Sequence, residues 1–385
     1  MANMVGILTL NGFRNYGNIL QNLALQKIIS ELGYMPETLW YSSAGEGGFC
    51  NKVKMHVRNR DLFKTLTYQY KMRFSSEYKT MESLLHEREE NFKLFCDDNI
   101  SYAPFSISSA TLKSEEKQEM IGERYISLFS GSDQVWGLEG ANYPQMYFLP
   151  FVEQKKRNSF AASFGFAKIP DSRLLKQYQH GLSSMNNISV REIEGKNIVS
   201  DLTNKKVMVH LDPTLIFEQN DWSKVANQSQ LSVNYKYILT YFLGKKSQRI
   251  LSSIRQIAKK KHMRVINLND LEDTSFFAVG PADFVKLFNN ASYVYTDSFH
   301  GSVFSIIFQK RFLVFDRNDN MINMNSRINT LLTQMNLLER YVSSDATSND
   351  ITNIMDYPIN FDNSLRVISN NRTQSVIFLE KAIEG

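Results

Sequence analysis

The segment 293–315 constrains the fold most, because it predicts a strand, a sharp polar turn, a buried helix and a second strand in succession. The runs 293–296 and 311–315 are strongly apolar, and 303–308 fits the apolar face of a short helix. Two strands joined through a helix are typical of an α/β sheet. Open α/β sheets bind their ligands at the carboxyl ends of the strands. We therefore expect the turn 297–301, with the sequence DSFHG, to lie at a binding edge.

The N-terminal part of the chain predicts a similar unit. Residues 5–10 form an apolar run without helical period, which indicates a buried strand. A turn rich in Asn and Gly follows, and apolar residues then recur at helical spacing from 19 to 32, with Gly33 as a helix terminator. Residues 38–41 predict the next strand. A β-turn-α-β opening with glycine in the turn is typical of a Rossmann-like half-domain.

Length and the order of elements predict two domains. A chain of 385 residues exceeds the ~250–300 residues at which single cores stop growing. The expected fold class is α/β, with two Rossmann-like domains facing a central cleft. We place the N-terminal domain at 1–215, with a helical insertion of about 42–100, and the C-terminal domain at 216–385. The sequence contains neither a GxGxxG fingerprint nor a Walker lysine motif.

Positive charge is concentrated inside the predicted insertion. Residues 52–79 carry eight Lys or Arg against two acidic residues, whereas the whole chain has a net charge of +5. We therefore do not expect nucleic acid to bind across the whole surface. The basic stretch is either a solvated helical face or, through its interleaved Phe, Leu and Tyr, a contact with an anionic membrane surface.

Cysteine usage and hydropathy indicate the compartment. No stretch approaches the ~20 apolar residues of a membrane span, and the first residues predict a strand instead of a signal peptide. Cys50 and Cys96 are the only cysteines, and neither belongs to a CxxC pair. We expect a soluble cytoplasmic protein, with peripheral contact at the inner face of the membrane as an option. The residues near His300 suggest no metal, and we expect no cofactor.

Three polar residues at predicted strand ends are candidates for chemistry. His300 can exchange a proton near neutral pH, or it is a structural turn residue. Arg191 can grip a carboxylate or phosphate in bidentate fashion, or it forms an ordinary ion pair with a nearby acid. Asp133 can orient or deprotonate a substrate hydroxyl, or it caps a turn.

Further polar residues and glycines lie at expected cleft edges. Ser132 and Ser163 follow predicted strands and can bind sugar or phosphate. Asn15, Gly17 and Asn18 lie where the first helix begins. A glycine there either allows a ligand to approach or serves a tight turn.

Six short motifs, taken in their order, resemble those of the polysaccharide pyruvyl transferase family. The resemblance covers roughly residues 4–340. Any one of the motifs is weakly specific, whereas six in one order are specific. They are NYGNILQ at 15–21, SGSDQVW at 130–136, AASFG at 161–165, VRE at 190–192, LDPT at 211–214 and TDSFHG at 296–301.

The resemblance implies a fold like that of the B-type glycosyltransferases and an activity. The expected reaction transfers a pyruvyl group from phosphoenolpyruvate, the donor substrate, to two hydroxyls of a sugar. The product is a pyruvate ketal on a cell-surface polysaccharide or its lipid-linked precursor. His300 matches the family's catalytic histidine and is the expected general acid. Arg191 is the expected donor anchor.

The resemblance also sorts the remaining candidates. The N-terminal domain becomes the acceptor side and the C-terminal domain the donor side. The expected anion-binding residues are Arg191, Ser298, Gly301, Ser302 and Arg327. The expected acceptor or cleft-lining residues are Asn15, Gly17, Asn18, Ser132 and Ser163.

One position departs from the family pattern. Many members carry an arginine two residues before the histidine, where this chain has Ser298. The basic residues that can replace it are Lys310, Arg311, Arg317 and Arg327. Two other functions stay open: a glycosyltransferase that uses a nucleotide sugar, and a non-catalytic relative that binds glycans.

Overall fold

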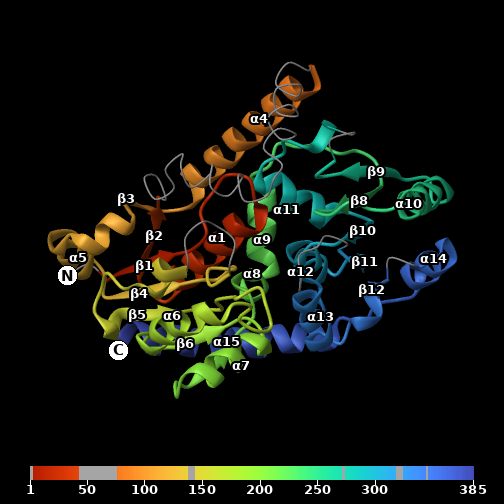
Figure 1. The fold of residues 1–385 in the computed structure, drawn as a ribbon. Coiled ribbons are helices and arrows are strands. Elements are labelled where there is room, and N and C mark those ends of the chain that lie inside the picture. The colour runs from red at the N-terminus through yellow and green to blue at the C-terminus, as the bar shows by residue number, and fades with distance from the viewer. Residues whose placement is uncertain (1–2, 43–75, 138–143, 271–273, 318–323, 344–345) are drawn as a thin grey trace, which may run out of the picture.

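The computed structural model describes residues 3–42, 76–137, 144–270, 274–317, 324–343 and 346–385 as two parallel sheets surrounded by helices (Figure 1). Most of the basic stretch 52–79, and Cys50, lie outside the described residues. The role of that stretch therefore stays a prediction.

The first sheet has the strand order β3-β2-β1-β4-β5, and all its neighbouring strands pair in parallel. A parallel pair, β6 and β7, extends this layer through bridges from Asn158 to Asn187 and from Ala162 to Val190. The strands are β1 (Met4–Leu8), β2 (Met35–Tyr41), β3 (Tyr102–Ile107), β4 (Ser127–Ser130), β5 (Arg157–Ser159), β6 (Ile188–Val190) and β7 (Val207–Val209).

Helix α1 (Tyr16–Glu31) begins where the sequence predicted it. The Asn15 side chain caps it by accepting hydrogen bonds from the amides of Gly17 and Asn18. The long α4 (Ser76–Asn99) is the described part of the predicted insertion. The other helices here are α5 (Glu115–Arg124), α6 (Ser172–Ser183), α7 (Ile193–Leu202) and the 3-10 turns η1 (Ser109–Lys113), η2 (Pro144–Phe148) and η3 (Gln154–Lys156).

The second sheet has the order β12-β11-β10-β8-β9, again parallel throughout. Its strands are β8 (Tyr237–Tyr241), β9 (Arg264–Asn267), β10 (Tyr293–Thr296), β11 (Arg311–Phe315) and β12 (Tyr341–Val342). Its helices are α10 (Gln248–Lys260), α11 (Pro281–Asn290), α12 (Phe299–Ile307), α13 (Met324–Gln334), α14 (Ser348–Asp356) and the turns η4 (Thr274–Phe276) and η5 (Leu338–Arg340). The predicted strand–helix–strand unit is confirmed as β10–α12–β11, with β10 fully buried.

Three helices connect the two halves: α8 (Pro213–Ile216), α9 (Gln219–Asn227) and α15 (Asp362–Glu384). The last of these returns to the first sheet, beneath which it runs in Figure 1. Ser127 Oγ and Asn158 Nδ2 both donate to the Ala382 carbonyl, at 3.1 and 3.2 Å. The chain thus ends against the domain in which it began.

An aromatic cluster joins the two domains. Tyr16 of α1 stacks on Phe284 of α11 with ring centroids 4.3 Å apart, and its hydroxyl donates to the Val279 carbonyl at 2.7 Å. Arg88 of α4 lies over the Tyr16 ring at 4.7 Å and donates to Asn269 Oδ1 at 3.1 Å. These contacts fix the amino end of α1 against the second domain, and α1 follows the carboxyl end of β1.

We expect Tyr16→Phe to lower the free energy of unfolding by about 1 kcal/mol, because the Val279 carbonyl loses its donor. Amide exchange at the start of α11 should accelerate as well. Tyr178→Phe is the matched control, since its hydroxyl donates to the Trp136 carbonyl at 2.8 Å within the first domain. Equal exchange at α11 in both variants would contradict a role for Tyr16 in joining the domains.

Candidate active site

The amino ends of α1 and α12 meet at His300. The His300 ring lies directly against Gly17, and a Cβ added to Gly17 would overlap the ring. Gly17 therefore lets the ring pack between the two domains. Of the residues predicted for the cleft, Gly17 and His300 come from opposite domains and are in contact.

Asp212, in the loop between β7 and α8, links the residues around His300. Its carboxylate is fully buried. Oδ2 accepts hydrogen bonds from Ser132 Oγ at 3.0 Å and Arg191 Nη1 at 2.8 Å, and it lies 3.8 Å from His300 Nε2. Oδ1 accepts from the Thr214 amide and hydroxyl at 3.0 and 2.6 Å. Burial opposes ionisation, yet His300 and Arg191 hold the pKa of Asp212 below its usual value.

Arg191 directly follows β6, and only some of the nitrogen atoms of its buried guanidinium have partners. Its Nε contacts Glu192 Oε1 at 2.9 Å, and Glu192 also accepts from Ser163 Oγ at 2.8 Å. The guanidinium lies 4.4 Å from the centre of the Phe299 ring. Its Nη2 is buried without a hydrogen-bond partner in the described structure. Arg191 thus forms the predicted ion pair and keeps one donor available.

A second arginine faces the same place. Arg327, from α13, lines a small cavity together with Arg191, Asp212 and Phe299. Burial, together with repulsion by Arg191, lowers the pKa of Arg327 to about 10. Two buried guanidinium groups at one cavity favour binding of an anion.

The protonation of His300 depends on these neighbours. Burial lowers the pKa of His300, the Asp212 and Asp133 carboxylates raise it, and Arg191 and Arg327 lower it again. The lowered pKa favours the neutral imidazole in the free protein. An anion that neutralises the two arginines would raise the pKa of His300 and favour its protonated form.

Two more first-domain candidates, Ser132 and Asp133, interact with this centre. The Ser132 amide donates to Gln21 Oε1 at 3.0 Å, in addition to the bond from its hydroxyl to Asp212. Asp133 Oδ1 accepts from the Gln134 amide at 2.8 Å, as the capping interpretation predicts, and its charge also acts on His300. Asn18 Oδ1 is buried without a hydrogen-bond partner in the described structure.

Ser298, Gly301 and Ser302 make hydrogen bonds within α12. Ser298 is the N-cap, and its Oγ accepts from the Gly301 amide at 3.3 Å. Ser302 Oγ donates to the Ser298 carbonyl at 3.0 Å. In this conformation these groups shape the start of the helix that carries His300, and their anion-binding role stays a prediction.

The structure separates the basic residues considered as replacements for the missing arginine. Arg311 is the first residue of β11 and Lys310 precedes it, so both lie at the amino edge, away from His300. Arg317 follows β11 at the carboxyl edge, and its charge acts on Arg327. Arg317 and Arg327 therefore lie on the side of the cleft.

Three residues of this region were not predicted as site residues. Asp212 lay in a quoted motif, and Glu192 adjoined Arg191, but only the contacts reveal their positions. Lys246 carried no signal in the sequence. Its Nζ lies 2.7 Å from Asp297 Oδ2 in a buried pair directly before Ser298.

No three His, Cys, Asp or Glu side chains in the described segments gather so that they could hold a metal ion. No helix in the same segments is long and apolar enough to cross a membrane.

Comparison with known families agrees with this arrangement. The family model for polysaccharide pyruvyl transferase matches residues 15–320, a range that contains Arg191, Asp212 and His300. The chain belongs to the polysaccharide pyruvyl transferase family. The predicted resemblance is confirmed, and the protein is a transferase. No curated protein sequence matches it.

Solved structures show the same architecture. The UDP-GlcNAc 2-epimerase from Methanocaldococcus jannaschii is 10% identical, with a TM-score of 0.54 over 99% of this chain and 100% of that one. The enzyme from Neisseria meningitidis, bound to UDP-GlcNAc, is 10% identical, with a TM-score of 0.52 over 98% and 99%. The enzyme from Rickettsia bellii is 9% identical, with a TM-score of 0.51 over 100% and 98%. The expected B-type glycosyltransferase fold is confirmed.

We expect Gly17→Ala to abolish most of the transferase activity while the protein stays folded. Alanine favours the helix by up to about 1 kcal/mol over glycine, but its Cβ displaces the His300 ring. Gly122→Ala in α5 is the control, because no atom lies within 4 Å of its added Cβ. Thermal unfolding and turnover should be measured for both. Full activity in Gly17→Ala would show that His300 need not lie against α1.

Proposed function

We propose that this transferase moves a pyruvyl group from phosphoenolpyruvate to two hydroxyls of a sugar in a cell-surface polysaccharide or its lipid-linked precursor. The supporting observation is His300 in one buried cluster with Arg191, Arg327 and Asp212, in a member of this family. Cations recognise the donor, and the histidine supplies a proton.

The donor carries a phosphate and a carboxylate, and the cluster offers a counterpart to each. Arg191 Nη2 is a buried donor without a partner in the described structure, and Arg327 lines the same cavity. The first amides of α12 add the positive end of a helix. The donor would thus contact Arg191 of the first domain and Arg327 and His300 of the second.

Donor binding prepares the acid in this mechanism. The two anionic groups offset the charges of Arg191 and Arg327, which lower the pKa of His300 in the free protein. The imidazole then takes up a proton at Nε2, beside Asp212 Oδ2 at 3.8 Å. Asp212 acts in this mechanism as a positioning residue for His300.

The proposed transfer begins with the proton of His300. Protonated His300 gives its proton to the methylene carbon of phosphoenolpyruvate, and the first sugar hydroxyl bonds to the neighbouring carbon. Asp133 accepts the proton of that hydroxyl. The second hydroxyl then attacks the same carbon, the carbon–oxygen bond to phosphate breaks, and inorganic phosphate leaves with the second proton. The ketal and inorganic phosphate are the products, and no redox step occurs.

The direct test incubates the protein with phosphoenolpyruvate and a panel of sugar acceptors, and follows phosphate release together with the mass of the sugar. His300→Ala should lower turnover by about 10²–10⁴-fold, the usual contribution of a general acid. His86→Ala, an exposed histidine on α4, is the control and should keep full activity.

Two results would overturn this function. One is stabilisation of the protein against heat by uridine diphosphate but not by phosphoenolpyruvate, which would favour a nucleotide-sugar enzyme. The other is binding of glycans without release of phosphate across the whole panel, which would indicate a non-catalytic relative.

The pH dependence tests Asp212 separately. The protonated imidazole is the active form and its pKa in the free protein lies below 6.5, so kcat/KM should fall as pH rises through that lowered pKa. Asp212→Asn removes a charge that raises the pKa of His300, so the decline should begin at lower pH. At a fixed pH above the pKa, kcat/KM should be about tenfold lower for each pH unit by which the decline moves. An unchanged pH profile at a lower overall rate would show that Asp212 has only a structural role.

A further inference from the structure

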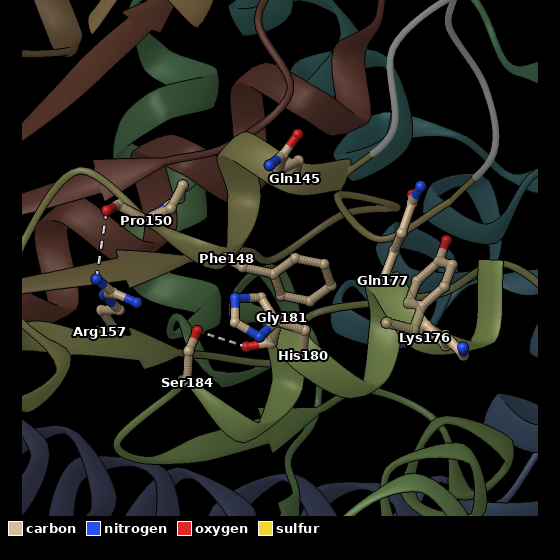
Figure 2. A pocket seen from close by; sticks show the side chains of 10 residues that line it. Gln145, Phe148, Pro150, Arg157, Lys176, Gln177, His180, Gly181 and Ser184 are labelled. Carbon is tan, nitrogen blue, oxygen red and sulfur yellow. Dashed lines mark hydrogen bonds between the residues drawn. The ribbon is translucent and has the colours of Figure 1, made fainter. Parts of the chain in front are cut away.

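A second pocket lies in the first domain, away from His300. It has a volume of about 340 Å³ and lies between η2 and α6. Figure 2 shows Phe148 and His180 near its centre, with Lys176 and Gln177 on one side and Arg157 and Ser184 on the other. A volume near 300 Å³ is the lower end of the range for small-molecule sites.

The lining combines positive charge with amide groups and an aromatic ring. The lining contains three side chains that are basic or can be protonated, namely Arg157, Lys176 and His180. It contains no acidic side chain. Gln145 and Gln177 add amides that both donate and accept hydrogen bonds. Basic side chains without a carboxylate among them favour an anion, and amides beside a ring face suit a sugar.

The wall of the pocket is firmly held. Gly181 lets α6 approach the Phe148 ring so closely that an added Cβ would overlap it. The Tyr178 hydroxyl donates to the Trp136 carbonyl at 2.8 Å, and the Phe148 ring stacks on Trp136 with centroids 5.5 Å apart. Arg157 donates to the carbonyls of Val152 and Pro150 at 2.7 and 3.3 Å. A site held in this way requires little reordering on binding.

The position of the pocket separates it from the transfer reaction. Arg157 is the first residue of β5, and Ser184 follows the end of α6 before β6 begins. The pocket therefore lies towards the amino edge of the sheet, whereas Arg191 leaves the carboxyl end of β6. A ligand can occupy it without contacting His300 or its neighbours.

We propose that this pocket binds one acidic sugar unit, whose anionic group is a carboxylate or a phosphate. The anion lies near Lys176 and His180, and the ring lies against Phe148 with its hydroxyls on Gln145 and Gln177. The site is separate from the transfer reaction and does not depend on the proposed function.

The test uses three probes of similar size: glucuronate, glucose 6-phosphate and neutral glucose, each titrated by calorimetry and by ligand-observed NMR. At least one acidic probe should bind at least fivefold more tightly than glucose. The double variant Lys176→Ala/His180→Ala should weaken that probe at least fivefold. Arg173→Ala, which removes a charge from the same helix outside the pocket, should leave binding unchanged. Saturating phosphoenolpyruvate should not displace the probe.

Several results would overturn the proposal. These are equal affinity for glucose and both acidic probes, unchanged affinity in the double variant, an equal loss in Arg173→Ala, and displacement by phosphoenolpyruvate. Lys176 and His180 are exposed, so their removal should not unfold the chain. If the alanine variant does unfold, Lys176→Gln/His180→Gln keeps polar side chains of similar length and makes the same test.

Discussion

The Asp212 carboxylate is fully buried, and an isolated charge in that position would cost several kcal/mol. Its oxygens accept hydrogen bonds from Ser132, Thr214 and Arg191, and His300 approaches from the other domain. Each partner lies at the end of a different strand or the start of a different helix. The single carboxylate therefore fixes how the first domain meets α12, and the position of the imidazole follows from that.

The same cluster brings the guanidinium groups of Arg191 and Arg327 to one cavity, beside several buried carboxylates. Arg191 is offset by Asp212 and Glu192, but Arg327 lines the same cavity and raises the local potential. Burial lowers the pKa of His300, Asp212 and Asp133 oppose that shift, and the two arginines add to it. In the proposed mechanism a doubly anionic donor would offset the two arginines and favour the protonated histidine, which would couple proton supply to donor binding.

Local patterns predicted the units that surround the site. The β10–α12–β11 unit was readable because two apolar strands flank a cap residue and one apolar helical face. Strand β3 was missed because it is a half-exposed edge strand that contains a proline. The return of α15 to the first sheet, and the central position of Asp212, depend on contacts between residues far apart in sequence. Such long-range contacts leave no periodic pattern in a single sequence.

Ser298 shapes the start of the helix that carries His300. At the N-cap, serine accepts the Gly301 amide and makes the helix start tightly, which an arginine side chain does not do. The positive charge that acts on the histidine comes from Arg191, after β6, and from Arg327 of α13. Arg191 belongs to the first domain and Arg327 to the second, and both line one cavity, so an anion bound there would contact both domains.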